Sequence, residues 1–388
     1  MSGPSDFDPE RVNLTEFGSI TQQGLITCFL TQAGNQYDGP LGIRIGSIFV
    51  IGVVSTVVTF FPVVATRIPR LKIPLYVYLF ARYFGSGVII ATAFVHLLDP
   101  AYAEIGPASC VGMTGGWSTY SWPPAIALSA AMITFLLDFL AEYYVQTRYG
   151  LPHNEAGIED TITSSATGRH QHLHSGEMDH HPDARPNSDK RLGENGDADG
   201  KHRASYADIE ELRHLDGDSK ETELAFKTQI AAFLILEFGV LFHSVFIGLN
   251  LGVADTSDFD TLFPVLVFHQ SFEGLGIGAR LSAIPFPDRL RSMPWLLCAA
   301  YGLTTPIAIA IGLGVRTTYD NSSFTANLVN GLFDSISAGI LIYTGFVEMI
   351  ARDFLFNPDR TQDKVRLGFM IVCLFLGAGI MALVGKWA

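Results

Sequence analysis

Two short stretches in the second half of the chain combine histidine, glutamine and glutamate with apolar neighbours. The first contains His243 and Ser244, and the second contains His269, Gln270 and Glu273. On a helix, His269 and Glu273 are i and i+4, so both side chains project from one face. Two neutral imidazoles with one carboxylate suit a borderline divalent cation such as zinc, and iron(II) or manganese less selectively. These residues therefore predict a metal site that carries little net negative charge and can release its ion.

The chain that must position these residues is acidic and apolar. Hydrophobic residues make up 48% of the 388 residues, charged residues make up 16%, and the net charge is −13. Soluble domains average about 25% charged residues, so this composition argues against an ordinary cytosolic enzyme. Binding of nucleic acid requires a basic face, and the negative balance predicts no such partner.

Eight apolar runs are long enough to cross the hydrocarbon core of a lipid bilayer, which takes about 20 helical residues. They predict an all-α integral membrane protein with eight transmembrane helices. The fourth and fifth runs contain the histidine, glutamine and glutamate residues. The runs cover residues 45–66, 75–98, 122–144, 229–253, 262–283, 293–315, 330–350 and 367–385.

The charges of the short loops predict the orientation in the membrane, because Lys and Arg concentrate on the cytoplasmic side. Basic residues follow the first, fifth and seventh runs, and acidic residues follow the second and fourth. With eight spans, both termini are then extracellular. The expected regions are an extracellular arm (1–40), helices one to three (41–145), a cytoplasmic loop (146–228) and helices four to eight with the metal site (229–388).

The helical rise of about 1.5 Å per residue predicts the depth of each candidate ligand. His243 lies ten residues from the outer end of its span, or roughly 15 Å down, and Glu273 lies eleven residues into the next span, or roughly 16 Å down. His269 is expected at about 10 Å, and His96 is expected almost at the outer surface. These depths predict a route past His96 to a midplane site. Four other carboxylates lie away from this depth and receive no metal role: Asp138, Glu237, Asp334 and Glu348.

Both stretches resemble helices four and five of the ZIP (Zrt- and Irt-like) metal transporters, most closely the fungal zinc-uptake and plant iron-uptake branch. The similar runs are Phe-His243-Ser244-Val-Phe-Ile-Gly and Phe-His269-Gln270-Ser-Phe-Glu273-Gly-Leu-Gly. The resemblance implies a plasma-membrane importer of zinc(II), with zinc as substrate and no cofactor. It implies that His243, His269, Gln270 and Glu273 form the transport site with the Ser244 hydroxyl, and that His96 lies near the outer entrance. Relatives with two adjacent metals carry Asn and Glu on helix four where this chain has Ser244 and Ile247, so a single central ion is predicted.

Three other interpretations remain open at this stage. The ligand set does not separate zinc from iron(II), manganese or cadmium, because such ligands leave selectivity to geometry. A metal-sensing membrane receptor that binds without transporting would carry the same residues. A metalloenzyme is disfavoured because the His-Glu-x-x-His pattern is absent and Gln270, which cannot act as the base, follows His269.

The loop of residues 146–228 carries 17 acidic residues, 10 basic residues and eight of the eleven histidines, and is expected to be disordered. Its histidines predict weak zinc capture on the cytoplasmic side, and its lysines offer sites for ubiquitin-dependent turnover. A homodimer is an expectation at the level of the family, and the outward-facing Cys28 and Cys110 leave a disulfide open. The histidines concerned are His170, His172, His174, His180 and His181, and the lysines are Lys190, Lys201, Lys220 and Lys227.

Overall fold

Helices make up the architecture of the part of the chain that the structure describes. The structure, a computed structural model, describes residues 26, 28, 37–68, 74–149, 206–318, 320, 322–357 and 360–387. No strand occurs among these residues. The chain divides into one unit formed by residues 1–142 and 222–388 and a second formed by residues 143–221. The first unit contains all the side chains considered below.

The long helices follow one another with short connections, and two of them continue into wider π-helical turns. The elements of the first half are α2 (Leu41–Arg67), α3 (Leu75–Ala91), η3 (Thr92–Leu98, π-helix), α4 (Asp99–Ile105), η4 (Gly115–Thr119) and α5 (Trp122–Tyr149). The elements of the second half are α7 (Tyr206–Val253), α8 (Thr256–Ala283), η5 (Asp288–Leu290), α9 (Met293–Val315), α10 (Phe324–Tyr343), η6 (Thr344–Phe356, π-helix), α11 (Lys364–Val384) and η7 (Gly385–Trp387).

The predicted spans all coincide with helices, and the composition of one helix sets it apart. Within the described residues, seven helices are long and apolar enough to cross a membrane. The remaining predicted span, the fifth, lies within α8, which has 28 residues and is long enough to cross a membrane but is less apolar than the other seven helices. The helix that departs from a plain apolar span is thus the one that carries His269, Gln270 and Glu273.

The start of α7 differs from the sequence prediction. Residues 206–228 were expected to belong to a disordered loop, but α7 begins at Tyr206 and runs without interruption to Val253. The expectation was wrong for this stretch because hydropathy detects only the apolar part of a helix. The polar part is rich in Glu, Leu and Lys, which are good helix formers. The histidines at 170–181 lie outside the described residues, as do Lys190 and Lys201.

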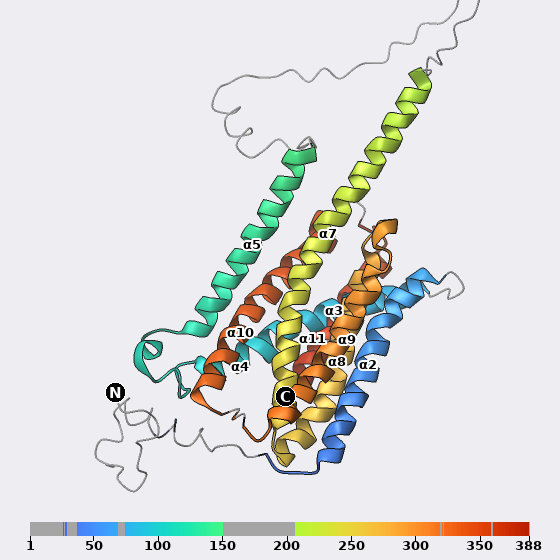
Figure 1. The fold of residues 1–388 in the computed structure, drawn as a ribbon. Helices are drawn as coiled ribbons and strands as arrows, with labels where there is room; N and C mark the ends of the chain where they lie inside the picture. The colour runs from blue at the N-terminus through green and yellow to red at the C-terminus, as the bar shows by residue number, and fades with distance from the viewer. Residues whose placement is uncertain are drawn as a thin grey trace, which may run out of the picture. The chain divides into compact units, whose positions relative to one another are not determined.

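Close glycine contacts hold α8 among its neighbours. Figure 1 shows α2, α8 and α9 side by side, and α8 also packs on α3. A Cβ atom added to Gly276 would lie 2.8 Å from Cα of Gly85, and one added to Gly278 would lie 2.1 Å from the carbonyl oxygen of Thr59. These contacts are possible only without side chains, as small residues in membrane helices allow. The glycines therefore set the position of the site-bearing helix against α2 and α3.

The turn between α7 and α8 is tied to the start of α2. The buried Arg44 guanidinium donates to the carbonyl oxygens of Ala254 at 2.6 Å and Asp38 at 2.8 Å. The Asp38 carboxylate accepts from the backbone N–H of Thr256 at 2.7 Å and from its hydroxyl at 2.8 Å. These hydrogen bonds hold the pKa of Asp38 below its ordinary value. This turn fixes the position of α7 relative to α8 along their length. Because both helices carry predicted ligands, it also fixes how those ligands lie relative to one another.

Cys28 and Cys110 are joined by a disulfide bond. The bond ties the arm before α2 to the segment after α4. It requires both residues on the same side of the membrane, as the predicted topology places them, and it is typical of an oxidising compartment.

Candidate metal site

Three predicted ligands converge inside the bundle. One ligand atom each of His243, His269 and Glu273 can be chosen so that all three lie within 4.8 Å of one another. Nε2 of His269 lies 3.3 Å from Oε1 of Glu273, as their i,i+4 spacing predicts. The ring centroids of His243 and His269 are 5.3 Å apart. All three residues are buried.

Several polar atoms of this cluster lack a hydrogen bond of good geometry within the described residues. They are Nε2 of His243 and Nδ1 of His269, together with Nε2 of His269 and Oε1 of Glu273, which face each other at 3.3 Å. Leaving a buried polar group without a partner costs about 1–3 kcal/mol, and more for a charged group. Such a set of orphaned lone pairs fits a bound cation better than a network that only fixes helix packing.

Gln270 and Ser244 lie next to the cluster, and Tyr301 on α9 contacts Gln270 and Glu273. The amide Nε2 of Gln270 lies 3.5 Å from the Ser244 hydroxyl. The Tyr301 hydroxyl lies 2.9 Å from Oε1 of Gln270 and 3.4 Å from Oε2 of Glu273. Sequence reasoning missed Tyr301, because its span carries no ionisable group and tyrosine is common in apolar helices. Its contacts orient Gln270 and Glu273, in the manner of groups that position metal ligands.

His96 lies deeper than the sequence predicted. It is 4% exposed, and its ring centroid is 4.8 Å from that of His269. The expectation of a place almost at the outer surface was wrong, because the helix continues through α4 to Ile105 and its apolar span therefore covers Leu75–Ile105. At nine residues from that end, His96 lies roughly 13 Å down. It also falls within η3, and such π-helical segments are frequent at functional sites.

Asp334 was expected away from the depth of the ligands but lies beside His243. Its Oδ1 is 3.9 Å from Nδ1 of His243, and both side chains are buried. The depth was misjudged because α10 begins at Phe324, six residues before the predicted start of the span. Asp334 is thus ten residues into the helix, about 15 Å, which matches the estimated depth of His243.

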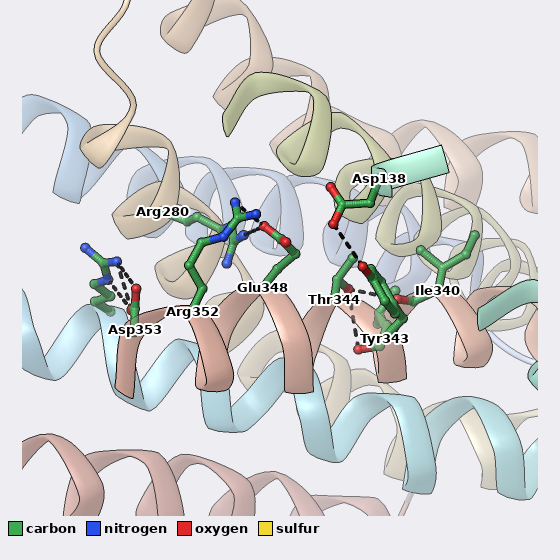
Figure 2. Close-up of polar contacts among 10 residues, drawn as sticks. Asp138, Arg280, Ile340, Tyr343, Thr344, Glu348, Arg352 and Asp353 are labelled. Atoms are coloured by element: carbon green, nitrogen blue, oxygen red, sulfur yellow. Dashed lines mark hydrogen bonds and ion pairs between the residues drawn. The ribbon is translucent and has the colours of Figure 1, made fainter. Parts of the chain in front are cut away.

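A cavity of about 380 Å³ lies one helical turn beyond Glu273. Gly276 and Arg280 of α8 line it, together with Glu348, Arg352 and Asp353 of η6. In a π-helix the hydrogen bonds join i and i+5, so residues four and five apart share a face. Figure 2 shows the two guanidinium groups directed at Glu348, at 2.6 Å for Arg352 and 3.7 Å for Arg280. Charged side chains thus line the cavity, and α8, the helix that carries the site, forms one of its walls.

The other two carboxylates lie apart from the cluster. Asp138 accepts a hydrogen bond from the Tyr343 hydroxyl at 2.9 Å (Figure 2). Glu237 is 3% exposed, and neither carboxylate oxygen has a hydrogen-bond partner within the described residues. Neither belongs to the group of converging ligand atoms.

A buried cluster of two imidazoles and a carboxylate inside a multi-pass helical bundle defines a membrane protein that handles metal ions. The model of the ZIP zinc transporter family matches residues 41–385, and the chain belongs to this family of transporters rather than to a class of enzymes.

Relatives in yeasts and plants agree with this assignment. The chain is 53% identical to "Zinc-regulated transporter 1" of Saccharomyces cerevisiae over 98% of this chain and 97% of that protein. It is 40% identical to "Zinc-regulated transporter 1" of Schizosaccharomyces pombe over 91% and 87% of the two chains. It is 30% identical to "Zinc transporter 5" of rice over 93% and 91%. No solved structure matches the chain.

Proposed function

We propose that this protein imports zinc(II) across the plasma membrane into the cytoplasm and binds the ion at His243, His269 and Glu273. The observation that carries the proposal is the convergence of three buried ligand atoms within 4.8 Å. Gln270 and Ser244 supply neutral oxygen atoms beside them, and His96 stands at the edge of the site. The names of the yeast and rice relatives support zinc as the substrate.

The charge of the ligand set suits transport as well as binding. Two neutral imidazoles and one carboxylate neutralise only half of a divalent charge, so the ion is held in a buried place without being fully compensated. Zinc accepts nitrogen and oxygen ligands together, whereas calcium and magnesium require more oxygen atoms. We infer that the site binds the ion transiently and then releases it.

The cavity beside Gly276 provides the release route in this proposal. It begins one turn beyond Glu273 and extends to Phe356 at the end of η6 and to Asn357 after it. The loop after that element carries Arg360, Lys364 and Arg366, which places it in the cytoplasm by the positive-inside rule. In this proposal an ion leaving the central site passes Gly276 and enters this cavity on its way to the inner surface.

The direction of transport and the cellular location belong to the same proposal, together with the predicted topology. Both termini lie outside, the disulfide of Cys28 and Cys110 faces an oxidising exterior, and the long loop lies in the cytoplasm. The loop histidines then capture arriving zinc, and the loop lysines serve regulated turnover. Assembly as a homodimer belongs to the same proposal.

The test is uptake of radiolabelled zinc by cells that lack their own zinc importers. Wild-type protein should give saturable uptake that excess iron(II) does not suppress. His243→Ala at matched surface level should remove that uptake. Absence of uptake by the wild type would reject the plasma-membrane importer. Suppression by iron would instead favour an importer of broader range.

Tyr301→Phe should weaken zinc uptake without destroying it. The variant loses the hydroxyl that contacts Gln270 at 2.9 Å, and a hydrogen bond of this kind contributes about 1 kcal/mol, or roughly a fivefold change. The KM for zinc should therefore rise about fivefold while the maximal rate stays close to that of the wild type. Tyr343→Phe is the matched control, because its hydroxyl bonds Asp138 away from the cluster. Equal KM values for both variants would contradict the positioning role.

A further inference from the structure

A second group of buried oxygen atoms lies between α4 and the first half of α10. Asn330 and Asp334 are i and i+4 on α10, so both side chains project from one face. Glu104 on α4 lies within electrostatic range of Asp334 and in contact with the side chain of Asn330. Gly331 allows this approach, since a Cβ atom added there would lie 3.2 Å from Cβ of Glu104. Two carboxylates and an amide thus converge where the two helices meet.

One oxygen atom of each of these side chains lacks a hydrogen-bond partner within the described residues. They are Oε2 of Glu104, Oδ1 of Asn330 and Oδ1 of Asp334. Asn330 is 3% exposed and Asp334 is 7% exposed. Burying such groups unpaired is costly, and two neighbouring carboxylates also repel each other. A divalent cation between them would satisfy these oxygen atoms and would also reduce the repulsion between the two carboxylates.

The group is connected to the central site through one imidazole. Oδ1 of Asp334 is 3.9 Å from Nδ1 of His243, and His243 is itself one of the three converging ligands. An ion held by Glu104, Asn330 and Asp334 would therefore be adjacent to the first residue of the central cluster. The sequence places α4 towards the outer surface, because the acidic loop after the second span faces outward.

We propose that Glu104, Asn330 and Asp334 form an outer station, a separate binding site for the divalent cation from which the ion passes to His243. This inference rests on the proposed function and adds a site to the single central ion predicted from the sequence. When both carboxylates are ionised, as they would be with a bound cation, the group carries a charge of −2, which matches that of a dication. Oxygen ligands hold zinc less tightly than the histidine-containing centre, so the ion moves inward.

Zinc binding to the purified full-length protein tests the station directly. The loop histidines are common to all variants, so their contribution cancels when variants are compared. Glu273→Ala, which weakens the central site, should still bind one zinc ion per chain more than the same variant with Glu104→Gln and Asn330→Leu added. Equal stoichiometry in the two backgrounds would overturn the proposal.

Uptake kinetics provide the second measurement and separate the station from a structural role. Asn330→Leu should raise the KM for zinc by about tenfold, the effect typical of weakening one metal-binding contact, with little change in maximal rate. Asn330→Asp keeps an oxygen ligand and should keep the KM at or below that of the wild type. An equal rise in both variants would mean that the position serves packing and would reject the station.

The control for charge is Asp260→Asn, since Asp260 is exposed near the outer start of α8 and lies in neither cluster. It should leave both the stoichiometry and the KM unchanged, whereas Glu104→Gln should raise the KM.

Different results would reject the two proposals, the central transport site and the outer station. Normal uptake by Glu273→Ala would reject the central transport site, and a stoichiometry insensitive to Glu104 and Asn330 would reject the outer station alone.

Discussion

Glu273→Ala should abolish saturable zinc uptake while the full-length protein still reaches the membrane. Glu273 supplies the only negative charge of the central ligands, and it is fully buried next to His269 at 3.3 Å. Removing even a group that only positions a metal ligand typically costs about 10–100-fold in metal affinity. Loss of a ligand that carries charge should therefore lower zinc affinity by at least about 100-fold. Uptake should therefore fall to the level of cells without the protein.

The measurement is the initial rate of radiolabelled zinc uptake, normalised to the amount of protein at the cell surface. Glu273→Gln separates charge from shape, because it keeps the size of the side chain and removes the negative charge. It should also lose most uptake. Asp260→Ala removes an exposed carboxylate from the same helix and should transport normally. Zinc accumulation by Glu273→Ala at the wild-type rate would refute the assignment of the site.

The membrane spans could be predicted because burial in lipid imposes one simple requirement on the sequence. A helix must be apolar over about 20 residues, and the prediction of residues 293–315 agrees with α9 at both ends. The ends of the other spans could not be predicted equally well. Helices continue into polar residues, as α4 does through Asp99 and Glu104, and hydropathy stops at the first charge.

This error at the helix ends explains both misjudged depths. His96 and Asp334 were placed towards the surface because their helices were taken to end or begin too early. Each is in fact about nine or ten residues from a helix end, close to the estimated depth of His243. The i,i+4 pair of His269 and Glu273 did not depend on any boundary, and the structure places the two side chains together.

Contacts between side chains of different helices are the second feature of the site that could not be predicted from the sequence. Tyr301 reaches Gln270 from a different helix, and no spacing along the chain encodes that meeting. The same holds for Arg280, which lies two turns after Glu273 on α8 and pairs with Glu348 on η6. The glycines of α8 indicated close packing, but the partners of that packing required the three-dimensional arrangement.

Gly278→Val should prevent stable folding more strongly than any surface substitution in the chain. A Cβ atom at this position would lie 2.1 Å from the carbonyl oxygen of Thr59, a backbone atom that cannot rotate away. Overpacking of a close-packed interior costs about 1–3 kcal/mol and occasionally more, against a total stability of about 5–15 kcal/mol. Relief would require α8 to move away from α2, which would also displace the His269 and Glu273 side chains.

Thermal unfolding of the purified protein in detergent measures the effect. Gly379→Val is the matched control, because the same change occurs on an exposed position of α11 where a Cβ atom meets nothing within 4 Å. The control should keep the wild-type Tm and zinc uptake, since it makes the same change in helix propensity without a steric contact. Gly278→Val should lower the Tm and the amount of protein in the membrane together, and Gly278→Ala should produce an intermediate loss. Equal Tm values for Gly278→Val and Gly379→Val would show that the position of α8 does not depend on this contact.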